Sequence, residues 1–384
     1  MKRPKVSILT HDISGGTFTN LCTALVQGMN ELGVDANLVL LYASPEELSR
    51  YPNIPIVTLN VKRTAFSLWA TVRYLREYQP DVVLPMPWYF NIVAVWARYL
   101  AGVQTKVILG EHNIISLEAE IEHRDKPHLR FLPVLMRYVY PHSDGLIGVS
   151  KDTLTDLTET LKIAADIPMR VVLNPINPAR VQQLAQSPID HPWFQNHELP
   201  VIVTAARMAK QKQLDGLLYA FAQVIKETPA RLLILGDGPL RVELESLSRT
   251  LGIADSVWMP GYDTNPYRYM ANADVFVLAS AWEGCPIALQ EAMACGAAVV
   301  VTDAPGGMKD IVEYGKAGMV VPANKPEALA EGILKILAQP DLKQHYREQA
   351  KLRSQTFHYL NTSQQYIDFC QFVLASPFKE KEAV

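Results

Sequence analysis

The chain has 384 residues, of which 49% are hydrophobic, and a formal net charge of −3 at pH 7. This length predicts two domains with separate cores, and the nearly balanced charge argues against a protein that coats nucleic acid. No run reaches the ~18 apolar residues of a membrane helix, and the basic start at residues 1–10 is unlike a signal peptide. The four cysteines are scattered without CxxC spacing. We therefore expect a cytoplasmic protein with reduced thiols.

The first half of the chain alternates short apolar runs with amphipathic stretches, which predicts parallel strands joined by helices. The expected strands are residues 6–10, 37–41, 81–84, 105–109, 144–149 and 170–173. Gly15 and Gly16 stand between the first strand and a helix at 17–32. Glycines let the backbone approach a ligand closely, although such a pair more often only makes a tight turn.

His112 follows the strand at 105–109, within the sequence Gly110-Glu111-His112-Asn113. The carboxyl edge of a parallel strand faces the crevice in which α/β sheets bind ligands. Because of this position, we give equal weight to a ligand-contacting role and a purely structural role for His112. For Glu111 we favour a structural or acceptor-side role.

Two stretches of the first half, residues 61–78 and 127–140, interleave basic and aromatic side chains. Such a pattern can bind a membrane surface. It also fits helices that turn their apolar face to the core, and we favour this second interpretation. After residue 180 the chain is polar and interrupted by prolines, so we place a linker at 181–199, between domains at 1–180 and 200–359.

The second half opens with a strand at 201–205 and a loop that carries Arg207 and Lys212. A guanidinium and an ammonium group can bind phosphate oxygens, although isolated basic loop residues are usually only solvated. The strand at 231–235 ends in Gly236-Asp237-Gly238-Pro239. This turn fails as a dinucleotide fingerprint, because the third glycine is missing, which argues against an oxidoreductase.

The centre of the second half is a strand at 275–278, a loop, a short helix from Pro286, and a strand at 298–301. The first amides of this helix, at Ile287, Ala288 and Leu289, would be free to bind a phosphate. Glu283 in the loop and Glu291 in the helix would accept hydrogen bonds from sugar diols. An anion site beside diol-binding carboxylates predicts a nucleoside diphosphate sugar as ligand.

Glu283 and Glu291 are separated by seven residues, Gly284-x-Pro286 lies between them, and residues 291–296 follow. This pattern resembles the signature of the retaining glycosyltransferases of family 4, glycosyl transferases group 1. The resemblance runs nearly continuously over 201–322, with Ala298 and Lys309-Asp310 as departures. In the first half it covers mainly the glycine pair and His112. It implies an α/β protein of B-type (GT-B) architecture, in which two Rossmann-like domains with parallel sheets face a central cleft, with a helix near 360–384 crossing back to the first domain.

The resemblance also implies roles for individual residues. Glu283 would hold the transferred sugar and His112 would meet it from the first domain, and these two are the expected catalytic residues. Glu291 would hold the ribose, and Arg207 and Lys212 the diphosphate. The expected donor-binding set is Gly15, Gly16, Arg207, Lys212, Gly236, Tyr262, Glu283, Gly284, Cys285, Pro286, Ile287, Leu289 and Glu291. No cofactor or metal is expected, since Asp-x-Asp does not occur in the chain.

The predicted function is transfer of a hexose-type sugar, with retained configuration, from a UDP- or GDP-sugar to a hydroxyl of a glycan, lipid-linked or small-molecule acceptor. We expect no nucleic-acid partner, and treat peripheral contact of the first domain with the cytoplasmic face of a membrane as open. One alternative is a nucleotide-sugar epimerase, which needs carboxylates on both faces of the sugar. Another is a non-catalytic nucleotide-sugar-binding protein, against which the intact Arg207, Lys212, Glu283 and Glu291 set argues.

Overall fold

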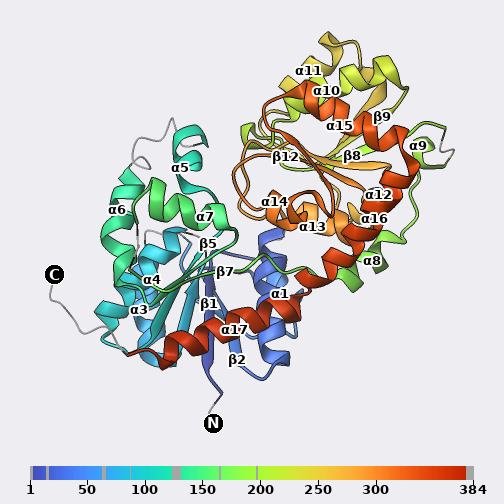
Figure 1. The fold of residues 1–384 in the computed structure, drawn as a ribbon. Helices are drawn as coiled ribbons and strands as arrows, with labels where there is room; N and C mark the ends of the chain where they lie inside the picture. The colour runs from blue at the N-terminus through green and yellow to red at the C-terminus, as the bar shows by residue number, and fades with distance from the viewer. Residues whose placement is uncertain are drawn as a thin grey trace. The chain divides into compact units, whose positions relative to one another are not determined.

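The computed structural model describes residues 3–13, 17–62, 66–86, 88–122, 131–163, 166–195 and 198–377. It forms two compact units, shown in Figure 1. Unit 1 contains Met1–Pro175 and Tyr359–Val384, and unit 2 contains Ile176–His358. In the part of the chain described, we find no helix with both the length and the apolar composition needed to span a bilayer.

Within its described residues, unit 1 is built on one parallel sheet with the strand order β3-β2-β1-β4-β5-β6-β7. The strands are β1 (Lys5–Thr10), β2 (Asp35–Leu40), β3 (Ile56–Thr58), β4 (Val82–Pro85), β5 (Lys106–Glu111), β6 (Gly145–Gly148) and β7 (Met169–Val171). Most of their residues are buried and apolar, as expected for a parallel sheet covered on both faces. The strands predicted from apolar runs are confirmed, and β3 is an addition.

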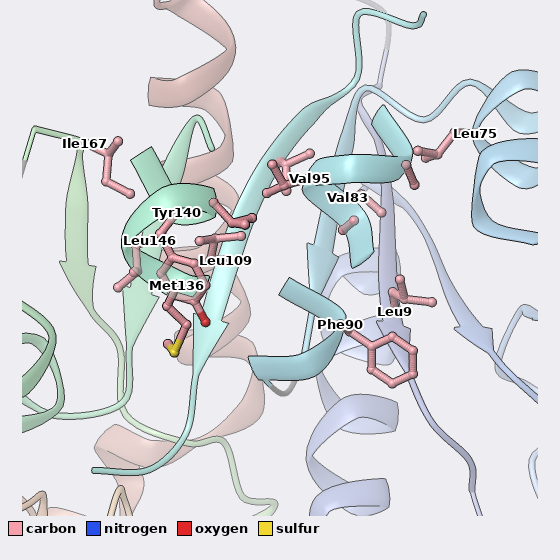
Figure 2. Close-up of a cluster of buried hydrophobic side chains, with 14 of the residues drawn as sticks. Leu9, Leu75, Val83, Phe90, Val95, Leu109, Met136, Tyr140, Leu146 and Ile167 are labelled. Carbon is pink, nitrogen blue, oxygen red and sulfur yellow. The ribbon is translucent and has the colours of Figure 1, made fainter. Parts of the chain in front are cut away.

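Helices cover both faces of this sheet. They are α1 (Thr17–Glu31), α2 (Pro45–Ser49), α3 (Ser67–Tyr78), α4 (Trp88–Ala101), α5 (Ile115–Leu117), α6 (Leu132–Val139), α7 (Lys151–Thr155) and α17 (Tyr359–Ala375). Helices α3, α4 and α6 share one core with the strands. In Figure 2 this core includes Leu9, Val83 and Leu109 from strands together with Leu75, Val95 and Met136 from helices.

The last helix, α17, packs on α1 in unit 1. A side chain at Gly28 of α1 would meet Ser363 Oγ at 2.3 Å, so glycine lets the two helices approach closely. Next to this contact, Tyr359 Oη donates to Glu31 Oε2 at 3.0 Å. Phe369 and Val373 lie beneath Gly145 of β6. The chain thus returns to its first unit for its last described helix.

Unit 2 is a second parallel sheet, with the order β10-β9-β8-β11-β12-β13 in its described residues. The strands are β8 (Val201–Ala205), β9 (Arg231–Leu235), β10 (Val257–Gly261), β11 (Val275–Leu278), β12 (Val299–Asp303) and β13 (Met319–Pro322). The helices are α8 (Pro178–Ala185), α9 (Pro192–Gln195), α10 (Leu214–Glu227), α11 (Arg241–Thr250), α12 (Tyr267–Ala271), α13 (Ile287–Ala294), α14 (Met308–Ile311), α15 (Pro326–Ala338) and α16 (Pro340–Ser354).

The segment 181–199, expected as a linker, instead packs into unit 2. It includes most of α8 and all of α9, and His191 stacks on Trp258 with ring centroids 3.8 Å apart. Asn265 Nδ2 donates to the Leu184 carbonyl at 3.0 Å. Pro178 and Pro192 stand at the first positions of the two helices, where the missing N–H costs nothing, and Pro188 lies between them.

Candidate functional site

The first candidate site lies at the carboxyl edge of the sheet in unit 2. Strands β8 and β11 are neighbours there, and the chain leaves them in opposite directions across the sheet. Such a switch point opens a crevice between the two loops that follow the strands. The loop after β8 carries Arg207 and Lys212, and the loop after β11 carries Glu283.

Glu283 and Lys212 form an ion pair across this switch point. The Lys212 ammonium lies 2.5 Å from Glu283 Oε1, and Ser280 Oγ donates to the same oxygen at 2.6 Å. The side chains are 6% and 17% exposed for Glu283 and Lys212, so the pair is largely removed from water. The two residues assigned to different parts of the donor therefore contact each other directly.

The backbone of Glu283 is held by the loop after β12. Its N–H donates to the Pro305 carbonyl at 3.0 Å, and Gly307 N–H donates to the Gly284 carbonyl at 2.8 Å. Gly306 has a φ of +117°, and a side chain there would come within 1.5 Å of the Glu283 carbonyl oxygen. Only glycine fits this position, which fixes the direction of the Glu283 side chain.

The loop after β8 is tied to the same region. Ala281 N–H donates to the Gln211 carbonyl at 2.8 Å, and Gln211 Nε2 donates to the Trp282 carbonyl at 3.0 Å. These bonds orient the turn Lys210–Lys212, so that Lys212 points to Glu283 rather than to solvent. Arg207 is exposed and has no ion-pair partner among the described residues, and is therefore available to an anion.

Helix α13 begins at this site, with Pro286 as its extended N-cap and Cys285 buried before it. Within the described residues the amides of Ile287 and Ala288 have no backbone partner. The Leu289 amide donates to the Pro286 carbonyl at 3.1 Å. The expectation of three free amides is thus wrong for Leu289, because the first turn closes early on the proline carbonyl.

Glu291 lies one turn into α13 and is bound by a residue that the sequence did not indicate. Tyr267 Oη donates to Glu291 Oε1 at 2.7 Å. Burial raises the pKa of the Glu291 carboxyl to about 7, and the bond from Tyr267 opposes this rise. Tyr267 is 24 residues away in sequence, so no local pattern connects the two. Ser280 was also missed, although it stands three residues before Glu283.

Gly236 and Tyr262 stand at the ends of β9 and β10. Gly236 has a φ of +120°, and a side chain there would meet the Ala206 carbonyl oxygen at 2.1 Å. Its N–H donates to the Gly261 carbonyl at 2.8 Å, which ties the ends of β9 and β10 together. Tyr262 follows directly and is largely exposed.

The second candidate site is a pocket of about 450 Å³ in unit 1. It lies at the switch point of the first sheet, between the loops after β1 and β4, and next to the end of β5. Its lining is Thr10, His11, Asp12, Phe18, Thr19, Trp88, Tyr89, Glu111, His112, Asn113, Ile115 and Glu118. Gly15 and Gly16, which were expected here, lie outside the described residues.

His112 contributes to the lining of this pocket. Both ring nitrogens are buried without a hydrogen-bond partner of good geometry among the described residues. Burial lowers the pKa of His112 to about 4, and the nearby Asn174 side chain acts in the opposite direction. Its ring meets Phe18 edge-on at 5.2 Å. His112 is therefore neutral at pH 7 and can offer a hydrogen bond to a ligand.

Glu111, beside it, is held by the protein itself. Its Oε1 accepts hydrogen bonds from Tyr140 Oη and, at 2.7 Å, from Asn91 Nδ2. Burial raises the pKa of the Glu111 carboxyl to about 8. These bonds account for a structural role, although Glu111 also contributes to the pocket wall. Among the described residues, no three His, Cys, Asp or Glu side chains converge as a metal site would require.

Both units of the chain match models of known protein families. The model of the Glycosyltransferase Family 4 domain matches residues 19–180, and that of the Glycosyl transferases group 1 domain matches residues 187–353. A similar curated protein is the N-acetylgalactosamine-N,N'-diacetylbacillosaminyl-diphospho-undecaprenol 4-alpha-N-acetylgalactosaminyltransferase of Campylobacter jejuni. It is 26% identical over 314 residues, which cover 82% of this chain and 80% of that protein.

Solved structures agree at the level of the fold. Anabaena HepE, crystallised with UDP, superposes with a TM-score of 0.75 at 19% identity, covering 96% of this chain and 100% of its own. A glycosyltransferase from Rickettsia africae superposes with a TM-score of 0.75 at 16% identity, covering 98% and 100%. The family assignment rests on the two Rossmann-like domains together with the matches to the two family models. The chain therefore belongs to the family 4 glycosyltransferases, glycosyl transferases group 1, which have the GT-B fold.

Proposed function

We propose that this glycosyltransferase moves a hexose from a UDP- or GDP-sugar to a hydroxyl group, with retention of the anomeric configuration. The observation that carries the proposal is the cluster of Lys212, Glu283 and the free amides of α13 at the switch point of the second sheet. A cation and free amides suit a diphosphate, and carboxylates suit sugar hydroxyls. The UDP in the HepE structure supports the same class of donor.

In the proposed reaction the bond between the anomeric carbon and the phosphate oxygen breaks while a bond to the acceptor oxygen forms on the same face. The acceptor proton passes to a donor phosphate oxygen, so no separate base is needed. Negative charge develops on the leaving diphosphate, where Arg207, Lys212 and the Ile287 amide would stabilise it. In this proposal, these groups stabilise the leaving diphosphate without a metal ion.

The two carboxylates have separate roles in this proposal. Glu283 accepts hydrogen bonds from hydroxyls of the transferred sugar, since Ser280 and Lys212 hold one of its oxygens in a fixed direction. When the diphosphate arrives, the Lys212 ammonium bonds to both it and Glu283. Glu291 accepts from the ribose hydroxyls while Tyr267 orients it.

Unit 1 would contribute the acceptor pocket and His112 as a neutral hydrogen-bonding group. The acceptor named for the Campylobacter relative is linked to undecaprenol through a diphosphate, which favours a lipid-linked acceptor here. Such an acceptor would bring the enzyme to a membrane surface. Both family models and the Campylobacter relative are named as glycosyltransferases, which disfavours the epimerase and the non-catalytic alternatives.

The first experiment is a calorimetric titration of the protein with UDP, GDP, ADP and NAD. We expect one nucleoside diphosphate to bind preferentially, and Arg207→Ala to weaken it by about 10–100-fold, because charge-assisted hydrogen bonds are lost. Lys210→Ala is the matched control, since Lys210 is an exposed cation of the same loop. Equal weakening by both substitutions, or preferential binding of NAD, would contradict the proposed donor site.

The stereochemistry and the metal independence need a product assay. With the preferred donor and a simple acceptor, NMR of the product should show the same anomeric configuration as the donor. The rate should be unchanged in EDTA, because Arg207, Lys212 and the helix dipole offset the diphosphate charge. An inverted product would refute retention, and a rate restored only by Mg²⁺ would refute metal independence.

A further inference from the structure

The outer surface of unit 1 carries an unusual concentration of exposed apolar side chains. Nine of the eighteen large hydrophobic side chains exposed in the described residues belong to α3, α4, α6 and the residues that directly precede α3 and α6. They are Phe66, Trp69, Trp96, Tyr99, Leu100, Phe131, Val134, Leu135 and Tyr138. We call the outer faces of these three helices the aromatic face.

The three helices lie on the same side of the first sheet. Their inner faces share one core with the strands, through Leu75 of α3, Val95 of α4 and Met136 of α6 (Figure 2). Helix α4 contacts both α3 and α6. Arg76 of α3 ties the first pair together, because its guanidinium donates to the Leu100 and Ala101 carbonyls at 2.8 and 3.2 Å.

The exposed side chains of α3 follow a single stripe. Phe66 and Trp69 are 67% and 69% exposed, and Arg73 and Arg76 continue the stripe at helical spacing. This stripe has two aromatic rings at one end and two guanidinium groups at the other, where the exposed Glu77 lies one helical turn from Arg73. It belongs to the stretch 61–78 in which basic and aromatic residues alternate.

Helix α4 has no charge on its outer face. Its one charged residue, Arg98, points inward to bond with the Asp144 carboxylate and the His142 carbonyl. Trp96, Tyr99 and Leu100 are exposed on the other side. A helix that is apolar on both sides lacks the polar outer face of an ordinary surface helix.

Helix α6 repeats the pattern of α3. Phe131 and Tyr138 are 71% and 74% exposed and lie two turns apart, with Val134 and Leu135 between them. Arg137 is exposed beside them, and its Nε donates to the Leu161 carbonyl at 2.6 Å. The aromatic face therefore ends in a second pair of rings with an adjacent cation.

The charge of this face is opposite to that of the chain. The exposed charged residues of the three helices are Arg73, Arg76 and Arg137 and one acidic residue, Glu77, since Arg98 points inward. The whole chain has 36 basic and 39 acidic residues. Exposed patches of this kind mark interaction sites, and amphipathic rings next to arginines suit the boundary between lipid headgroups and acyl chains. The excess of positive charge complements anionic headgroups.

We propose that the aromatic face docks on a bilayer containing anionic lipid, with Phe66, Trp69, Phe131 and Tyr138 entering the headgroup boundary. This inference extends the lipid-linked acceptor of the proposed function to a particular surface. It is tested without donor or acceptor, so that it and the proposed reaction can fail separately.

The test is flotation of the purified protein with vesicles of phosphatidylglycerol and phosphatidylethanolamine, and with vesicles of phosphatidylcholine alone. We expect binding to the anionic vesicles that weakens with salt. Trp69→Ala with Tyr138→Ala should reduce it by about tenfold or more, and Arg73→Glu should also reduce it. Tyr219→Ala, an exposed aromatic residue of α10 in unit 2, is the matched control and should bind as the native protein does.

Folding of the variants is checked by their thermal midpoint and by UDP binding, whose proposed groups lie in unit 2. Native-like vesicle binding by the folded double variant, or no binding by the native protein, would overturn the proposal. If the native protein instead forms a dimer in solution that the double variant abolishes, the occupant is a second copy of the chain and the lipid proposal is wrong.

Discussion

At the scale of single residues, the donor site depends on a few buried polar contacts. Glu283 binds Lys212 and Ser280 through the same oxygen, while Glu291 binds Tyr267. Each carboxylate has one oxygen committed to the protein in these contacts. The remaining acceptor positions are oriented before a ligand arrives, which reduces the entropy lost on binding.

Replacing Glu283 with Gln should separate binding from transfer. The amide keeps the shape but loses the charge that pairs with Lys212 and holds the sugar. We expect kcat to fall by about 10²–10³-fold, with the dissociation constant of the nucleoside diphosphate changed by less than about threefold. Activity is measured with the preferred donor and binding by calorimetry. Retained activity together with lost nucleotide affinity would assign Glu283 to the nucleotide instead.

The pKa of Glu291 predicts a pH dependence of donor binding. The carboxyl is protonated below about pH 7 in the folded protein, and only the ionised form accepts two ribose hydrogen bonds. Affinity for a nucleotide sugar, whose diphosphate has no proton to lose in this range, should rise as the pH increases through about 7. Tyr267→Phe removes a bond to the ionised form and should shift the midpoint upward. If the pH midpoint of donor binding were unchanged in Tyr267→Phe, Tyr267 would not influence the ionisation of Glu291.

The same raised pKa affects stability with a definite sign. Between the ordinary carboxyl value of 4.5 and about 7, the folded state binds more protons at Glu291 than the unfolded state does. The contribution of this group to stability is therefore present at low pH and is lost as the pH rises through about 7. Comparing the unfolding free energy of the native protein and Glu291→Gln across this range isolates the effect.

At the scale of elements, loops that follow neighbouring strands hold each other in place. The loop after β12 contacts the backbone of Glu283 so closely that a side chain at Gly306 would overlap its carbonyl. The turn at Gly236 does the same between the ends of β8, β9 and β10. The geometry of the donor site thus depends on packing between loops that are distant in sequence.

Gly306→Ala should damage both stability and activity. The added carbon requires the Glu283 backbone to move, and it also occupies a positive φ. We expect a loss of about 2–4 kcal/mol in unfolding free energy and a large loss of transfer activity. Gly216→Ala is the control, because the added carbon in α10 meets nothing closer than 4.0 Å and alanine favours the helix. The unfolding free energies of both variants are measured by denaturant unfolding. If the two variants were equally stable, the predicted overlap at Gly306 would be contradicted.

At the scale of the whole molecule, the chain is two units with their own sheets and cores. The proposed diphosphate groups, Arg207, Lys212 and α13, all belong to unit 2. Calorimetry should therefore show that saturating UDP raises the unfolding temperature of one transition more than that of the other, since a ligand stabilises the state that binds it. Arg207→Ala should reduce that rise. If UDP raised the unfolding temperature of the whole chain by the same amount, the two units would unfold as one.

The sequence by itself determined the strands, the two Rossmann-like domains and the Glu283–Glu291 loop and helix, because these depend on apolar runs and on spacing within one short stretch. It misjudged 181–199, since prolines that break a chain also begin helices. The tertiary structure alone decided that Lys212 pairs with Glu283, that Tyr267 binds Glu291, and that α3, α4 and α6 expose their aromatic residues together. These contacts join residues distant in sequence, and only the packing of the strands and helices brings them within reach of one another.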